Sequence, residues 1–154
     1  MNPESRFLTH PLRDVNAWVN YFRNAEIPVL SYTAQRIDEM AADEDSADVN
    51  VLADTINDDP LMTLRLLRHV SNLRKGNRGS APETVLEALV LIGVCPLFRA
   101  FEHMPSVQDW LADWPEALDG LSHVIAQGYL AARFAQGFSA HRSDHDASVI
   151  HEVA

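Results

Sequence analysis

The chain has 154 residues, of which 47% are hydrophobic and 22% charged, and this composition predicts one globular domain with a substantial core. A net charge of −10 disfavours a broad electrostatic surface for nucleic acid or anionic membrane, and we predict neither as a partner. No apolar run is long enough to span a bilayer and the amino terminus lacks a signal-peptide core, so we expect a cytoplasmic protein.

Helical periodicity begins near the amino terminus. Residues 15–22 carry one apolar stripe, which predicts an amphipathic helix within a helical lead-in at residues 1–25. Residues 27–30 (IPVL) are too short, and too interrupted by Pro28, for a strand, and they predict an extended segment. Ser31 then stands where an N-cap residue would begin the next helix.

Two amphipathic helices are predicted on either side of an acidic loop. Their inward positions are Ala34, Ile37, Met40 and Ala41 in the first helix and Val49, Leu52, Ala53 and Ile56 in the second. Residues 38–59 hold nine carboxylates and no lysine or arginine. A solvated face and loop is one interpretation of this run, and a docking surface for a basic partner is the other.

The stretch NDDPLMTLRLLRHVSN (57–72) has a clear helix start. Asp59 is a favoured N-cap residue, and Pro60 suits the first helical position, where its missing N–H is not needed. At 100° per residue the helix has an apolar side and a basic edge. The apolar side comprises Met62, Leu66, Leu67, Val70 and Leu73, and the edge comprises Arg65, Arg68, His69, Asn72 and Lys75.

Beyond a glycine-rich loop at residues 74–82, a helix is expected to open at Pro82 and stop at Gly93. A short helix follows, in which Cys95, the only cysteine, is expected as a small buried hydrophobe. Ser106 with Asp109 three residues later has the spacing of a capping pair.

Residues 115–138 have apolar or small side chains on almost every face, which predicts a central, buried helix. Gly128, Ala131, Ala132 and Ala135 would let a neighbouring helix approach closely. A last helix starting after Ser143 has no stop signal before Ala154, so we expect the chain to be a piece of a longer protein. The predicted fold is all-α, a bundle of about seven to nine helices.

Three segments, at residues 26–40, 52–72 and 85–94, resemble in order and spacing the HDOD domain, the HD-related output domain of bacterial signalling proteins. The matching residues are Ile27, Pro28, Val29, Leu30, Asp59, Pro60, Leu61, Leu64, Leu67, Asn72, Ala88, Leu91 and Gly93. The resemblance implies an all-helical HDOD-like domain at residues 26–154. It also implies a non-catalytic regulatory role in signal transduction, exerted through protein–protein interaction with other signalling proteins. Structural roles within the motif fall to Pro28, Asp59, Pro60, Leu64, Leu67 and Gly93.

The same resemblance raises a metal-dependent alternative, because the domain is related to HD phosphohydrolases of nucleotides and cyclic dinucleotides. Their metal ligands are histidines and aspartates, for which His123, the pair His145–Asp146 and the pair His151–Glu152 are the weak candidates here. No complete set is present, so such a site would need ligands beyond residue 154. We therefore predict no catalytic residue, metal or cofactor, and interpret His123 as a hydrogen-bonded core histidine.

The basic edge, extended by Arg78, is the candidate binding face: Arg65, Arg68, Asn72, Lys75 and Arg78. Such cations can hold a phosphate or an acidic partner segment, and a nucleotide-sensing pocket is the weaker form of that hypothesis. The alternative is internal, with these cations paired to the carboxylates of residues 38–59.

Overall fold

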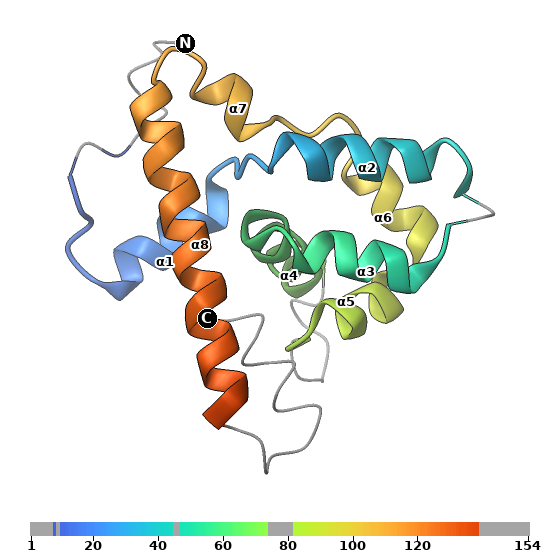
Figure 1. Cartoon of the computed structure of the whole chain (residues 1–154). Coiled ribbons are helices and arrows are strands. Elements are labelled where there is room, and N and C mark those ends of the chain that lie inside the picture. Colours follow the sequence, from blue (N-terminus) through green and yellow to red (C-terminus); the bar gives the residue numbers. More distant parts are fainter. Residues whose placement is uncertain (1–7, 9, 45–46, 74–81, 139–154) are drawn as a thin grey trace.

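A computed structural model of the chain describes residues 8, 10–44, 47–73 and 82–138 (Figure 1). Within these residues it contains eight helices and no strand, as the all-α prediction requires. The helices are α1 (Val15–Asn24), α2 (Ser31–Ala41), α3 (Val49–Asn57), α4 (Pro60–Leu73), α5 (Val85–Ile92), α6 (Val94–Ala100), α7 (Val107–Trp110) and α8 (Pro115–Phe138). None of the described helices has the length and apolar character that crossing a bilayer requires.

The core lies among α2, α3, α4, α5 and α6, where α4 contacts α3 and α5, and α2 contacts α3 and α6. The predicted inward positions of α2 and α3 are buried or packed against this core. On α4, Met62, Leu66 and Val70 are buried as predicted. Leu73 is 61% exposed, so its assignment to the buried side is wrong: it is the last residue of the helix.

The extended segment at residues 27–30 runs beside the residues that precede α7. The Val29 N–H donates to the Pro105 carbonyl at 3.0 Å, and the Val107 N–H donates to the Val29 carbonyl at 2.8 Å. These bonds form an isolated parallel bridge between Val29 and Ser106. The segment therefore satisfies its backbone by pairing with a distant part of the chain, without belonging to a sheet.

The predicted cap at Ser106 is confirmed, whereas Pro82 does not begin α5 and Ser31 does not cap α2. The Ser106 hydroxyl accepts the Asp109 N–H at 3.0 Å, as the spacing predicts. Thr84 caps α5, which begins at Val85 and not at Pro82. Ser31 is no cap: it is the first residue of α2, and its hydroxyl donates to Oε1 of Gln108 at 2.7 Å.

Gly93 separates α5 from α6 at a φ of 81° and a ψ of 154°. This backbone region is reserved almost entirely for glycine, because a Cβ atom makes it strained. The predicted stop at Gly93 is confirmed. Cys95, two residues later, is exposed, so its prediction as a buried hydrophobe is wrong: the short helix α6 buries Leu97 and Phe98 instead.

α8 lies at one side of the molecule, next to α1 and outside the bundle of α2–α6 (Figure 1). Ala132 is its only buried residue, so the prediction of a central, buried helix is wrong. Apolar side chains on every face of a helix show that each face could be buried, but not that each face has a neighbour. The stripe of α1 is likewise not buried, since no residue of that helix is.

Candidate functional site

The side chain of Asp59 joins the start of α4 to Leu30, the residue that precedes α2. It is fully buried, and its Oδ1 accepts the N–H groups of Leu61 and Met62 at 2.9 and 3.1 Å, which caps α4. Its Oδ2 accepts the Leu30 N–H at 2.7 Å, at the start of α2. Beside it, the Thr63 hydroxyl donates to the Ile56 carbonyl at 2.9 Å. These bonds make the junction a structural element, since every contact is with the chain's own backbone.

Both arginines of the basic edge of α4 donate hydrogen bonds to backbone carbonyl oxygens. Nη1 of Arg65 donates to the Ile27 carbonyl at 2.5 Å, and its guanidinium lies 5.7 Å from the Phe101 ring centre. Nη1 of Arg68 donates to the Phe22 and Ala25 carbonyls at 2.7 and 2.5 Å, at the carboxyl end of α1. Carbonyls at a helix end attract cations, which explains the docking of α1 on α4.

Burial lowers the pKa of Arg65, with a further contribution from the neighbouring charge of Arg68. Burial also lowers the pKa of His69, whose ring meets the Phe101 ring edge-on at 5.1 Å. Asn72 is exposed, whereas Lys75 and Arg78 lie outside the described residues. The five predicted members of the binding face are therefore not seen together. Among the described residues, the two arginines bond to backbone carbonyls and to no carboxylate.

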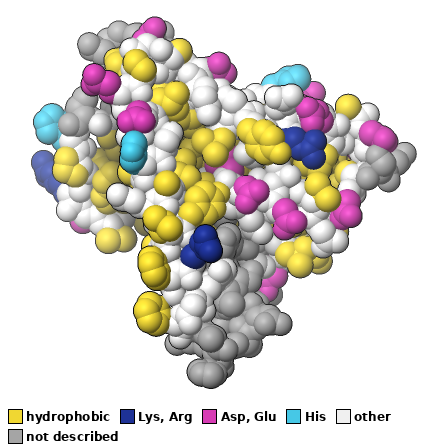
Figure 2. All heavy atoms as spheres, in the orientation of Figure 1, with side chains coloured by type: hydrophobic (Ala, Val, Ile, Leu, Met, Phe, Trp, Pro, Cys, Tyr) yellow, Lys and Arg dark blue, Asp and Glu magenta, His cyan; other side chains and the backbone are white. Residues whose placement is uncertain are grey.

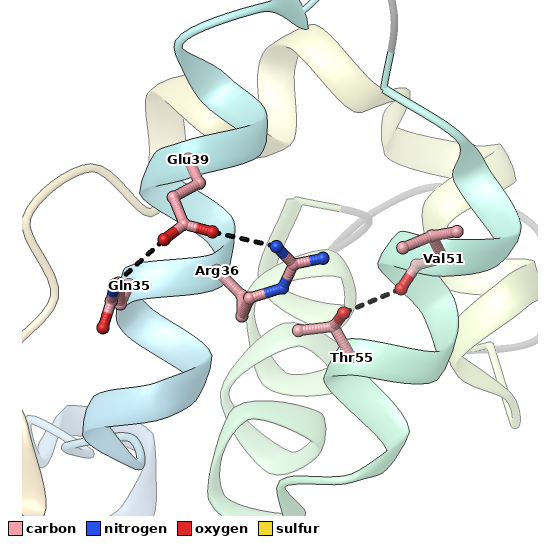
Figure 3. Close-up of polar contacts among 5 residues, drawn as sticks. All are labelled: Gln35, Arg36, Glu39, Val51 and Thr55. Atoms are coloured by element: carbon pink, nitrogen blue, oxygen red, sulfur yellow. Dashed lines mark hydrogen bonds and ion pairs between the residues drawn. The ribbon is translucent and has the colours of Figure 1, made fainter.

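Glu39 on α2 finds its polar partners within the same helix. Nη1 of Arg36 and Nε2 of Gln35 each donate to Glu39 at 2.9 Å, and these bonds lower the pKa of Glu39 (Figure 3). Across from them on α3, the Thr55 hydroxyl donates to the Val51 carbonyl at 2.8 Å (Figure 3). Arg36 thus pairs within its own helix, which contributes little to stability at such an exposed site.

His123, the metal candidate within the described residues, is exposed on α8, so its interpretation as a core histidine is wrong. Its Nδ1 lies 2.9 Å from the Asp119 carbonyl, one turn earlier on the same helix. His145, Asp146, His151 and Glu152 lie outside the described residues. Within residues 8, 10–44, 47–73 and 82–138, no group of three or more histidine, cysteine, aspartate or glutamate side chains could hold a metal ion.

Two apolar hollows lie beside α8, and we call them together the α4–α8 trough. The first, of about 360 Å³, lies among α1, α7, α8 and the start of α4, and the second, of about 330 Å³, lies between α4 and α8. Leu61 and Leu121 line both. The other α8 residues lining the second hollow are Val124, Ile125, Gly128, Tyr129 and Ala132.

A polar contact lies at the second hollow, which Tyr129 lines. The Tyr129 hydroxyl donates to the Asp58 carbonyl, which ties α8 to the turn between α3 and α4. Burial raises the pKa of Tyr129, and the charges of Asp58 and Asp59 add to the effect. Sequence reasoning missed this trough. The small residues of α8 were recognised, but they were expected to pack closely against a neighbouring helix, whereas Gly128 and Ala132 line the hollow between α8 and α4.

Large apolar side chains are exposed along α8, one of them, Val124, at the second hollow and the others outside the trough. Val124 is 64% exposed, Leu130 55%, Phe134 67% and Phe138 90%. Figure 2 shows hydrophobic side chains along α8 and in the region next to it. Exposed apolar groups that gather on one element mark interaction sites more often than isolated ones do.

The family model of the HDOD domain matches residues 27–150, about four fifths of the chain. The match contains the extended segment, the Asp59 junction, Gly93 and all of α8. No curated protein and no solved structure matches the chain.

Proposed function

Because the chain belongs to the HDOD domain family, we propose that it is a non-catalytic regulatory module of bacterial signal transduction that acts through protein–protein interaction. Its partners are other signalling proteins, and its compartment is the cytoplasm. Residues 1–25 serve as a helical lead-in to the domain.

The exposed apolar surface of α8 is the observation that carries this proposal. Four large apolar side chains of one helix are about half or more exposed, next to a trough whose walls are apolar. Contact with water costs roughly 25 cal/mol per Å² of apolar surface, so a protein that covers this surface gains affinity from it. A catalytic pocket would instead gather convergent polar groups.

The basic edge of α4 also supports the proposal, because its two arginines are already engaged within the domain. Arg65 and Arg68 already bond to backbone carbonyls of residues 22–27, which gives them a structural role inside the domain. A phosphate would have to displace these bonds before it reached the guanidinium groups. We therefore assign α1, α4 and the extended segment to the scaffold, and α8 with its trough to the partner.

The test is direct binding between purified proteins. The tagged full chain is used to isolate candidate partners from its source cells, and each candidate is then purified and titrated against the chain. We expect at least one candidate to form a stoichiometric complex and to change its activity on binding. Failure of every purified candidate to bind, together with metal-dependent hydrolysis of a nucleotide by the chain, would contradict the proposal.

A further inference from the structure

We propose that α8 is a releasable arm of the domain, and that the hydroxyl group of Tyr129 latches it to the turn between α3 and α4. α8 is docked in the structure, where its 24 residues lie outside the hydrophobic core. In the released state α8 swings away while the bundle of α2–α6 stays folded. This inference goes beyond the proposed function, since it does not depend on which molecule the domain binds.

The packing of α8 on the rest of the chain is thin. No residue of this helix belongs to the hydrophobic core, and Ala132 is the one residue in it that is buried. The second hollow, of about 330 Å³, lies between α8 and α4, so the two helices are not closely packed there. A segment with few buried apolar contacts opens at a lower free energy than the core does. Release of α8 can therefore leave the core intact.

One side-chain hydrogen bond joins α8 to another helix. The Tyr129 hydroxyl donates to the carbonyl of Asp58, the C-cap residue of α3. The other side-chain hydrogen bonds that α8 makes among the described residues, those of Ser122 and His123, stay within the helix. Docking thus depends on Tyr129 in a way that no other polar side chain of α8 shares.

The acceptor of this bond belongs to a firmly held turn. The Asp58 N–H donates to the Asp54 carbonyl at 3.0 Å, at the end of α3. The next residue, Asp59, is fully buried and accepts backbone N–H groups of α4 and of Leu30. Because these bonds fix the acceptor, the Tyr129 hydroxyl sets where α8 docks.

A short exposed segment ahead of α8 provides the pivot. Val107, the first residue of α7, is buried, and its N–H donates to the Val29 carbonyl at 2.8 Å. Residues 112–114, between α7 and α8, are exposed. Residues at the ends of elements can absorb the movement of a whole element in their backbone dihedral angles, and here they can do so without unpacking the core. α8 therefore swings about residues 112–114 while α7 keeps its place.

Release changes the surface that α4 presents. Leu61 and Leu64 of α4 line the second hollow together with residues of α8, and Leu61 also lines the first. In the released state this face of α4 is open to water. A molecule that binds one state more tightly than the other shifts the equilibrium between them, which gives a regulatory domain two states to select.

The test measures how fast a thiol reagent labels a cysteine placed at a buried alanine, in the full chain carrying Cys95→Ser. Ala132→Cys reports on α8, and Ala88→Cys on α5 is the matched control, since the two alanines are 2% and 0% exposed. We expect Ala132→Cys to be labelled at least ~100-fold faster than Ala88→Cys, and at a rate that low urea hardly changes, because local release exposes little surface. Ala53→Cys on α3 serves if Ala88→Cys does not fold, which circular dichroism checks.

Two further variants, each combined with Ala132→Cys, test the latch. Tyr129→Phe removes a hydroxyl that bonds to another helix, whereas Ser122→Ala removes one that bonds within α8. The net contribution of one hydrogen bond predicts labelling about fivefold faster for Tyr129→Phe and changed less than twofold for Ser122→Ala. Equal effects of these two variants would show that Tyr129 is no latch.

The labelling rates can contradict the arm itself in two ways. If Ala132→Cys and the core control are labelled at the same rate with the same dependence on urea, α8 opens only when the whole domain unfolds. If Ala132→Cys is labelled as fast as the exposed Cys95 of the original chain, α8 is not docked in solution. Either result overturns the inference.

Discussion

Oδ2 of Asp59 accepts the backbone N–H of Leu30 at 2.7 Å, while Oδ1 of the same carboxylate caps α4. One fully buried side chain thus holds together the starts of two helices that are 29 residues apart. The spacing of Asp59 and Pro60 predicted the cap from local rules. The bond to Leu30 is long-range and could not be read from that spacing.

Replacement of Asp59 by alanine should therefore cost more than the loss of a helix cap. A cap contributes roughly 0.5–2 kcal/mol, and an unpaired buried N–H adds roughly 1–3 kcal/mol. We expect the free energy of unfolding, measured by urea titration, to fall by about 2–4 kcal/mol. Asp48→Ala is the matched control, since the Asp48 side chain caps α3 from an exposed position. Equal losses for the two variants would contradict the dual role of Asp59.

Arg68→Ala should loosen α1 more than the rest of the domain. The guanidinium of Arg68 bonds to two carbonyls at the carboxyl end of α1, and no residue of α1 is buried. We expect amide hydrogen exchange to accelerate in α1, with a loss of only about 1 kcal/mol in global stability. Arg133→Ala, on the exposed surface of α8, is the control. Unchanged exchange in α1 would show that other contacts hold the helix.

The protonation of His69 should destabilise the fold. Burial and the charges of Arg68 and Arg65 lower its pKa in the folded chain, so the folded state binds protons less readily than the unfolded one. Its contribution to stability is full above the unfolded pKa of about 6.5 and is lost as the pH falls toward the lower folded value. His69→Phe should lose less stability than the original chain between pH 7.5 and pH 5.5. Parallel pH profiles for the two proteins would refute this assignment.

Gly93→Ala should destabilise the turn between α5 and α6. Its φ of 81° with a ψ of 154° is strained for any residue with a Cβ atom, at a cost of about 1–3 kcal/mol. Gly120→Ala provides the opposite expectation, because Gly120 lies within α8 and a Cβ there meets nothing within 4 Å. That variant should gain about 0.5–1 kcal/mol. Thermal unfolding of both variants gives the comparison, and the same sign of change in both would contradict it.

The sequence predicts best where a feature depends on neighbours along the chain. The Asp59 cap, the Ser106 cap, the stop at Gly93 and the buried stripes of α2 and α3 were all read from spacing of seven residues or fewer. It fails where the partner is distant: Ser31 bonds to Gln108, 77 residues away, and has no capping role. The error on α8 has the same cause, because periodicity does not reveal whether a neighbouring helix lies against each face.

The candidate site shows the same division. The arginines of α4 were recognised as one edge, but their acceptors, the carbonyls of Phe22, Ala25 and Ile27, carry no side-chain signature. The trough could not be predicted, since its walls come from α1, α4, α7 and α8. The sequence placed His123 on the correct helix but predicted it to be buried, and it is exposed. The cause is the same, because the exposure of α8 depends on its packing.

The central claim is that the domain works by binding and not by metal-dependent hydrolysis. The most direct measurement is the metal content of the full chain, purified without chelators and analysed by elemental mass spectrometry, together with turnover of nucleotides and cyclic dinucleotides. We predict that the chain holds less than one metal ion per molecule. We also predict that any turnover of nucleotides or cyclic dinucleotides in the preparation is unchanged in His123→Ala. Near-stoichiometric iron, manganese or zinc, with hydrolysis that is lost in His123→Ala, would contradict the account.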